Sequence, residues 1–154
     1  MIKPIFKDPL EKVVAHSPAE SEVYLGSPSL AVAPDGGIIA SHDFFGPKSP
    51  KDHFGREYMS RIYRSDDDGK TWVRLTDVRK AFWSSLFSYD GSLYLLGCSA
   101  HYGDIVIRRS DNWGRNWTDP SDGNSGILFR GGDGMSPPNY HCAPVPILEH
   151  KDRL

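Results

Sequence analysis

The sequence of 154 residues lacks a long apolar run, a basic cluster and any closely spaced pair of cysteines. A membrane-spanning helix needs about 20 consecutive apolar residues, so we expect no membrane contact. The net charge is −2, without a stripe of lysine and arginine, which argues against a nucleic-acid partner. The N-terminus has no apolar run typical of a signal peptide. As written it predicts a cytoplasmic protein, or a secreted or periplasmic one if the N-terminus is incomplete.

The two cysteines, Cys98 and Cys142, stand far apart in the sequence. Neither belongs to a Cys-x-x-Cys pattern, so the pattern indicates no metal or redox site. We expect two reduced, partly buried thiols, because free cysteine packs like a small apolar side chain. A disulfide bond in an exported protein is the alternative. No cofactor and no metal is expected.

Helical periodicity is almost absent, whereas short β-rich runs between Gly, Pro, Asp and Ser recur and predict an all-β fold. The strands expected in a first unit are 27–33, 38–42, 58–64 and 72–78, with a polar loop over 44–57. Those expected in a second unit are 83–88, 93–99, 105–109 and 127–130. A further strand is expected over 140–148.

The octapeptide SDDDGKTW at 65–72 matches the Asp-box pattern Ser-x-Asp-x-Gly-x-Thr-Trp at every fixed position. Asp67 is suited to accept backbone N–H groups of a turn, and Gly69 to adopt a positive φ. Trp72 is expected to bury its ring beneath the turn. A weaker copy, SDNWGRNW, follows at 110–117, and this spacing of about 45 residues is typical of one four-stranded propeller blade.

These two copies, the turn PDGG at 34–37 and the run GDIVIRRS at 103–110 resemble the sialidase (neuraminidase) superfamily of Asp-box, or BNR-repeat, proteins. The resemblance covers roughly residues 24–148. It implies a β-propeller of four-stranded antiparallel blades, of which this chain is a fragment of a six-bladed form. The first arginine that binds the substrate carboxylate in that superfamily has no counterpart in 24–29 or 82–85.

The expected organisation is an N-terminal segment (1–23), a first blade (24–80), a second (81–135) and the start of a third (136–154). Residues 13–18 are a possible latch strand. A blade buries its faces only against other blades, so the chain is expected to need further blades or self-association to close.

Propeller topology places the starts of inner strands and the loops between second and third strands at one mouth. The candidates for catalysis there are Asp43, as acid/base with His42, and Asp104. The candidates for binding a carbohydrate are Trp83, His101, Tyr102, Tyr140, His141 and Arg56. Aromatic rings, carboxylates and histidines are common in sites that process glycans. Each of these candidate residues has a structural alternative, in a turn, a solvated loop or the core. A metal site would require His42, His101 and His141 to converge.

Three functions fit this pattern. The leading hypothesis is a glycoside hydrolase of the sialidase superfamily, an exo-sialidase-like enzyme that uses two carboxylates. A polysaccharide lyase would instead use His42, His101, Tyr102 and His141. A glycan-binding propeller without catalysis is the third.

Overall fold

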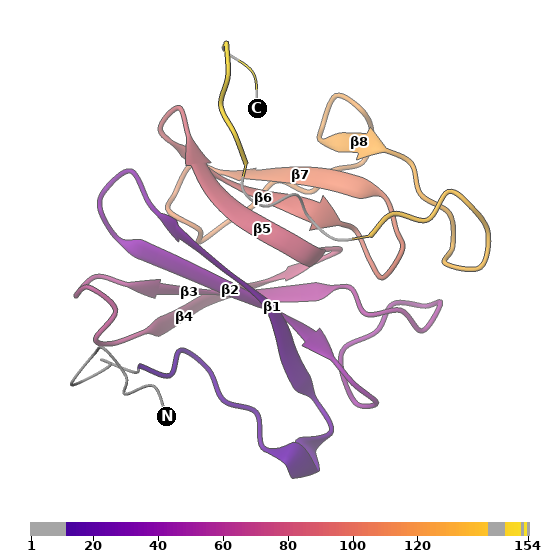
Figure 1. Cartoon of the computed structure of the whole chain (residues 1–154), viewed down its shortest axis with the longest axis horizontal. Helices are drawn as coiled ribbons and strands as arrows, with labels where there is room; N and C mark the ends of the chain where they lie inside the picture. The colour runs from indigo at the N-terminus through magenta and orange to yellow at the C-terminus, as the bar shows by residue number, and fades with distance from the viewer. Residues whose placement is uncertain (1–11, 142–146, 152, 154) are drawn as a thin grey trace, which may run out of the picture.

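The computed structural model describes residues 12–141, 147–151 and 153. They form one short 3-10 turn and two antiparallel sheets of four strands (Figure 1). The elements are η1 (Ala19–Ser21), β1 (Tyr24–Val32), β2 (Ile38–Phe45), β3 (Met59–Ser65), β4 (Val73–Arg79), β5 (Phe82–Tyr89), β6 (Ser92–Cys98), β7 (Ile105–Ser110) and β8 (Ile127–Phe129). In this part of the chain no helix has the length and apolar character needed to cross a membrane.

Each sheet is a meander, in which strands that follow one another in sequence are also hydrogen-bonded neighbours. The two sheets pack against each other, with the inner strands β1 and β5 in contact (Figure 1). Across this junction the Leu86 N–H donates to Ser29 Oγ at 2.9 Å, and the Ser88 hydroxyl donates to the Val32 carbonyl. Two adjacent meanders of this kind are the blades of a β-propeller, so the predicted fold class is confirmed.

The core lies between the two blades. Its buried side chains include Ile39 and Ile62 from the first blade and Leu86, Leu93 and Leu95 from the second. Along each strand these residues alternate with residues that point to the opposite face, because successive side chains of a β-strand point to opposite faces. Burial of this shared face holds the blades together.

Both inner strands carry a β-bulge at the same place. The register shifts between Gly26 and Ser29 in β1 and between Phe82 and Ser85 in β5. Within each bulge one residue other than glycine has a positive φ, 49° at Ser27 and 48° at Trp83. Such a backbone is sparsely populated for these residues and persists only where the surroundings hold it.

The two octapeptide turns, 65–72 and 110–117, share most of their internal hydrogen bonds. In the first, the Gly69 N–H donates to Ser65 Oγ at 2.9 Å and the Thr71 N–H donates to Asp67 Oδ1 at 2.8 Å. In the second, Ser110 Oγ and Asn112 Oδ1 accept the equivalent N–H groups at 2.9 and 2.8 Å. In both turns the tryptophan Nε1–H donates to the carbonyl of the glycine, Gly69 in the first and Gly114 in the second. Asparagine therefore replaces aspartate without loss of the turn.

Several strand bounds differ from the predictions, and the largest differences are at the start of β1, which begins at Tyr24 and not at residue 27, and at the end of β2. β2 continues to Phe45, so Asp43 and Phe44 lie inside the sheet and not at the start of a loop. Residues 39–44 are all buried because both faces of this strand are covered. Residues 13–18, the possible latch strand, are not paired with either described blade, and their pairing with a last blade stays a prediction.

The predicted strand 140–148 is not seen at 140–141 or 147–148, and residues 142–146 lie outside the described part of the chain. Cys142 is among them, so the state of the two cysteines stays a prediction. The start of a third blade also stays a prediction.

The first blade leaves an apolar face open. By strand register, Leu30 occupies the position in β1 that Leu86 occupies in β5. Leu86 is 6% exposed because it packs against the first blade, whereas Leu30 is 64% exposed and its neighbour Val32 is 61% exposed. Large apolar side chains exposed together on a sheet face mark an interaction surface.

We expect the 154-residue chain to self-associate in solution through this face. The double variant Leu30→Ser/Val32→Ser should shift the mass measured by light scattering to that of a monomer. Val73→Ser is the matched control, because Val73 is 64% exposed on the outer strand β4 and should not affect association. A wild-type chain that is monomeric at all concentrations would contradict the expectation.

Candidate functional site

The carboxyl group of Asp43 lies at the junction of the two blades and is 1% exposed. Its Oδ2 accepts the backbone N–H of Trp83 at 2.6 Å, and its Oδ1 accepts the hydroxyl of Ser60, the residue opposite on β3. The same Ser60 hydroxyl lies 3.1 Å from the Ala81 carbonyl. Asp43 therefore joins the first blade to the strained start of the inner strand of the second.

Burial raises the pKa of Asp43 to about 7, although hydrogen bonds from Ser60, Trp83 and Ser27 favour the charged form and act in the opposite direction. A carboxyl group with a pKa near neutral pH is populated in both protonation states. This is the condition that general acid/base catalysis requires.

Aromatic side chains gather around Trp83. The ring of Trp83 lies 3.9 Å from that of His141, 4.7 Å from His101 and 5.5 Å from Tyr102, measured between centroids. His101 and Tyr102 are stacked at 4.3 Å. Four of the residues predicted to bind carbohydrate, from β5, the β6–β7 turn and the segment after β8, thus form one group, which we call the Trp83 cluster.

The sequence analysis missed Glu57. Its Oε2 lies 3.3 Å from His101 Nδ1, and its carbonyl accepts the His101 N–H at 2.8 Å. Burial raises the pKa of Glu57, but the Lys51 ammonium, 2.6 Å from Oε1, a backbone hydrogen bond and the charge of His101 together leave the pKa below its usual value. Glu57 comes from the loop of the first blade and His101 from the second, so no local pattern could link them.

The hydrogen bonds of the His42 imidazole do not go to the Asp43 carboxylate, with which it was expected to cooperate. Successive side chains of a strand point to opposite faces, and the two residues are neighbours on β2. His42 Nε2 lies 3.2 Å from the Tyr63 hydroxyl, and Nδ1 lies 3.1 Å from the Asp43 carbonyl, not its carboxylate. Burial lowers the pKa of His42. Its imidazole is buried against the rings of Phe44 and Tyr63.

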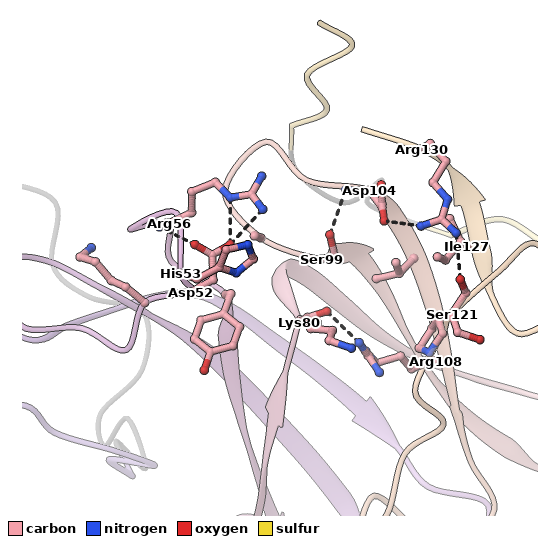
Figure 2. A pocket seen from close by; sticks show the side chains of 15 residues that line it. Asp52, His53, Arg56, Lys80, Ser99, Asp104, Arg108, Ser121, Ile127 and Arg130 are labelled. Atoms are coloured by element: carbon pink, nitrogen blue, oxygen red, sulfur yellow. Dashed lines mark hydrogen bonds and ion pairs between the residues drawn. The ribbon is translucent and has the colours of Figure 1, made fainter. Parts of the chain in front are cut away.

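Asp104 and Arg56 lie away from the Trp83 cluster, in the wall of a pocket between the blades (Figure 2). Asp104 Oδ1 accepts the Gly131 N–H at 2.8 Å, and Oδ2 lies 3.3 Å from Arg130 Nη1. Arg56 is held by Asp52, 2.9 Å away. These contacts direct the Asp104 carboxylate to the segment after β8, and its pairing with Asp43 in catalysis stays a prediction.

Tyr140 also lies outside the cluster. Its ring is 6.0 Å from that of Phe129, and its carbonyl is 3.7 Å from Cys98 Sγ. By strand register Cys98 in β6 is equivalent to Asp43 in β2. Asp43 is thus bonded to the backbone of Trp83 after the first blade, and Cys98 to the backbone of Tyr140 after the second.

The described residues contain no group of three His, Cys, Asp or Glu side chains arranged to hold a metal ion. His101 and His141 both contact the Trp83 ring, but His42 lies on the far face of β2. The three histidines considered as metal ligands do not converge.

No protein-family model and no curated protein matches the chain. Among solved structures it is similar to an α-L-arabinanase of Penicillium chrysogenum complexed with arabinobiose, with 26% identity and a TM-score of 0.46. The match covers 73% of this chain and 33% of the arabinanase, so the chain spans about a third of that enzyme's length. Because this TM-score is low, the assignment of propeller blades rests on the strand order of the chain itself.

Proposed function

We propose that the chain is part of a carbohydrate-active β-propeller of the sialidase type, and that a sugar ring binds at the Trp83 cluster. The observation that carries the proposal is the group of four rings formed by Trp83 and the three rings around it. The backbone N–H of Trp83 donates to the Asp43 carboxyl group. Aromatic rings offer flat apolar surfaces to the C–H faces of sugars, and the neighbouring polar groups orient them.

The reaction that we propose is glycoside hydrolysis, with Asp43 as the group that transfers the proton. Its pKa of about 7 leaves it partly protonated at neutral pH, as a general acid must be. His101, oriented by Glu57, is the second proton-transfer group within the cluster. A lyase that relies on His42 is less well supported, because His42 lies on the other face of β2.

A glycan-binding propeller without catalysis is the second candidate. The observation in its favour is the 1% exposure of Asp43 and its bonds to Ser60 and Trp83, which are those of a residue that braces two blades. Assays for new reducing ends and for unsaturated products distinguish hydrolase, lyase and binding protein.

Tyr102→Ala is expected to weaken binding of the recognised glycan about tenfold, because one aromatic surface is lost from the cluster. The ligand is first identified by screening a glycan array, and affinities are then measured by calorimetry. Tyr94→Ala is the matched control, since Tyr94 stacks on Phe87 at 5.2 Å in the same blade but outside the cluster. Equal binding by both variants would exclude the Trp83 cluster as the sugar site.

A further inference from the structure

The imidazole of His101 lies between the rings of the Trp83 cluster and a carboxylate. Its Nδ1 lies 3.3 Å from Glu57 Oε2, and its backbone N–H donates to the Glu57 carbonyl at 2.8 Å. The ring stacks on Tyr102 and meets the Trp83 ring edge-on, with an interplanar angle of 87°. Backbone, carboxylate and neighbouring rings therefore orient this imidazole together.

Glu57 is held from its other side by Lys51. The two residues face each other across an antiparallel bridge in the loop between β2 and β3, and Lys51 Nζ donates to Glu57 Oε1 at 2.6 Å. Burial raises the pKa of Glu57, but its hydrogen bonds and the charges of Lys51 and His101 together hold it below the usual value. The side chain is therefore ionised at neutral pH, with one oxygen toward an ammonium group and the other toward an imidazole.

An ionised carboxylate has only acceptor oxygens, and this decides which nitrogen of a neutral imidazole carries the proton. A lone pair on His101 Nδ1 would face the lone pairs of Glu57 Oε2 and would be repelled by them. A proton on Nδ1 makes the same contact attractive and leaves the lone pair on Nε2. The geometry thus favours the Nδ1–H tautomer.

The other ring nitrogen, Nε2, is open to a ligand. It forms no hydrogen bond within the part of the chain that the structure describes, and the His101 side chain is 37% exposed. An accessible imidazole nitrogen with a lone pair accepts a hydrogen bond or a proton from a hydroxyl group. In this tautomer His101 is an acceptor and not a donor toward whatever binds beside Trp83.

We propose that Glu57, oriented by Lys51, fixes His101 as its Nδ1–H tautomer and makes Nε2 the proton acceptor of the Trp83 cluster. Glu57 and Lys51 are then positioning residues, because they act through His101. The group that meets Nε2 must be a donor, such as a sugar hydroxyl group or a water molecule. The assignment of that donor to a glycan site rests on the proposed function, whereas the tautomer does not.

The test reads the tautomer from the ¹⁵N chemical shifts of the His101 ring in the labelled full chain, at alkaline pH where the imidazole is neutral. Protonated and unprotonated ring nitrogens have well-separated shifts, and the His101 signals are those absent from His101→Gln. We expect Nδ1 to be the protonated nitrogen. A proton on Nε2 in the wild-type protein would overturn the proposal.

Glu57→Gln is expected to move the proton to Nε2. Lys51 can only donate, so it holds the oxygen of the introduced amide and turns the amide N–H groups toward His101 Nδ1, which then has to accept. The substitution keeps the shape of the side chain and its bond to Lys51, so the chain should fold. Unchanged ring shifts in this variant would show that Glu57 does not select the tautomer.

Adding Lys51→Met to Glu57→Gln tests the role of Lys51. Without the ammonium group the amide oxygen is able to turn toward Nδ1, so the Nδ1–H tautomer is expected to return in part. A proton that stays entirely on Nε2 would contradict the role of Lys51. Glu22→Gln is the matched control, because Glu22 forms an ion pair of the same kind with Lys48 at 2.6 Å, and it should leave the His101 shifts unchanged.

The two proposals fail separately, because the ring shifts are measured without a ligand. If Glu57→Gln moves the proton but glycan binding does not respond to Tyr102→Ala, the tautomer stands and the proposed function falls. If a glycan binds at the Trp83 cluster while Glu57→Gln leaves the His101 shifts unchanged, the reverse holds.

Discussion

The Asp43→Asn variant is expected to gain stability relative to the wild-type protein as pH rises from about 4 to 8. The folded-state pKa of Asp43, about 7, lies above its ordinary value of 3.8, so the folded state binds the proton more tightly than the unfolded state. Stability from this group is therefore complete below pH 3.8 and is lost as pH rises through 7. The difference in the free energy of unfolding is roughly 3–4 kcal/mol.

Asparagine reproduces the protonated carboxyl group. Its Oδ1 accepts the Trp83 N–H, and its Nδ2 donates to Ser60 Oγ, whose own proton then goes to the Ala81 carbonyl. The contacts with Trp83 and Ser60 are kept, so we expect the variant to fold. Above pH 7 it should be more stable than wild type.

The measurement is denaturant unfolding of both proteins between pH 4 and 9. Asp90→Asn, in the exposed turn after β5, is the control and should keep the wild-type pH profile. Parallel profiles for wild type and Asp43→Asn would show that Asp43 does not have the raised pKa on which its proposed role depends.

Turnover completes the test. If Asp43 transfers the proton, Asp43→Asn should lower kcat by roughly 10²–10⁴-fold without loss of glycan binding, since general acid/base catalysis contributes about this much. Full turnover by the variant would remove Asp43 from the mechanism and leave it as a brace between the blades.

Trp117→Ala is expected to lower the free energy of unfolding by about 3 kcal/mol, near the lower limit for a core tryptophan. Trp117 and Trp113 pack against the core between the blades. A Cβ added at Gly114, in the same turn, would lie 3.4 Å from Ile62 and 3.5 Å from Leu75 of the first blade. The second octapeptide turn therefore packs on the preceding blade.

Trp72→Ala is the matched control. Its turn shares most of these hydrogen bonds, but no core residue lies near Gly69, and Trp72 does not pack against the core. We expect a loss of only about 1 kcal/mol. Denaturant unfolding of both variants measures the difference, and a larger loss for Trp72→Ala would reverse this account of the turns.

These two turns show how far sequence patterns reach. The pattern of 65–72 predicted correctly that Asp67 accepts a backbone N–H and that Gly69 has a positive φ, because both depend on residues within the same octapeptide. It also predicted that Trp72 buries its ring beneath the turn, whereas the tryptophan that packs on the core belongs to the weaker copy. Burial depends on what lies beside the turn, and only the second turn has a described blade beneath it.

The candidate site also contains contacts that the sequence could predict and contacts that it could not. Placing Trp83, His101, Tyr102 and His141 together was possible from the sequence, because propeller topology brings these strand ends to one mouth. The contact between Glu57 and His101 was not, because it joins loops of different blades.

The sequence alone determined that this chain is all-β, that its strands form four-stranded blades and that its turns use side chains to bind their own backbone. Each of these depends on interactions between residues that are close in the chain. Only the tertiary structure decided that His42 and Asp43 act on opposite faces, that Asp43 is buried with a raised pKa and that cations of both blades surround one pocket. Burial and electrostatic fields come from neighbours distant in sequence, and these are fixed only when the blades pack.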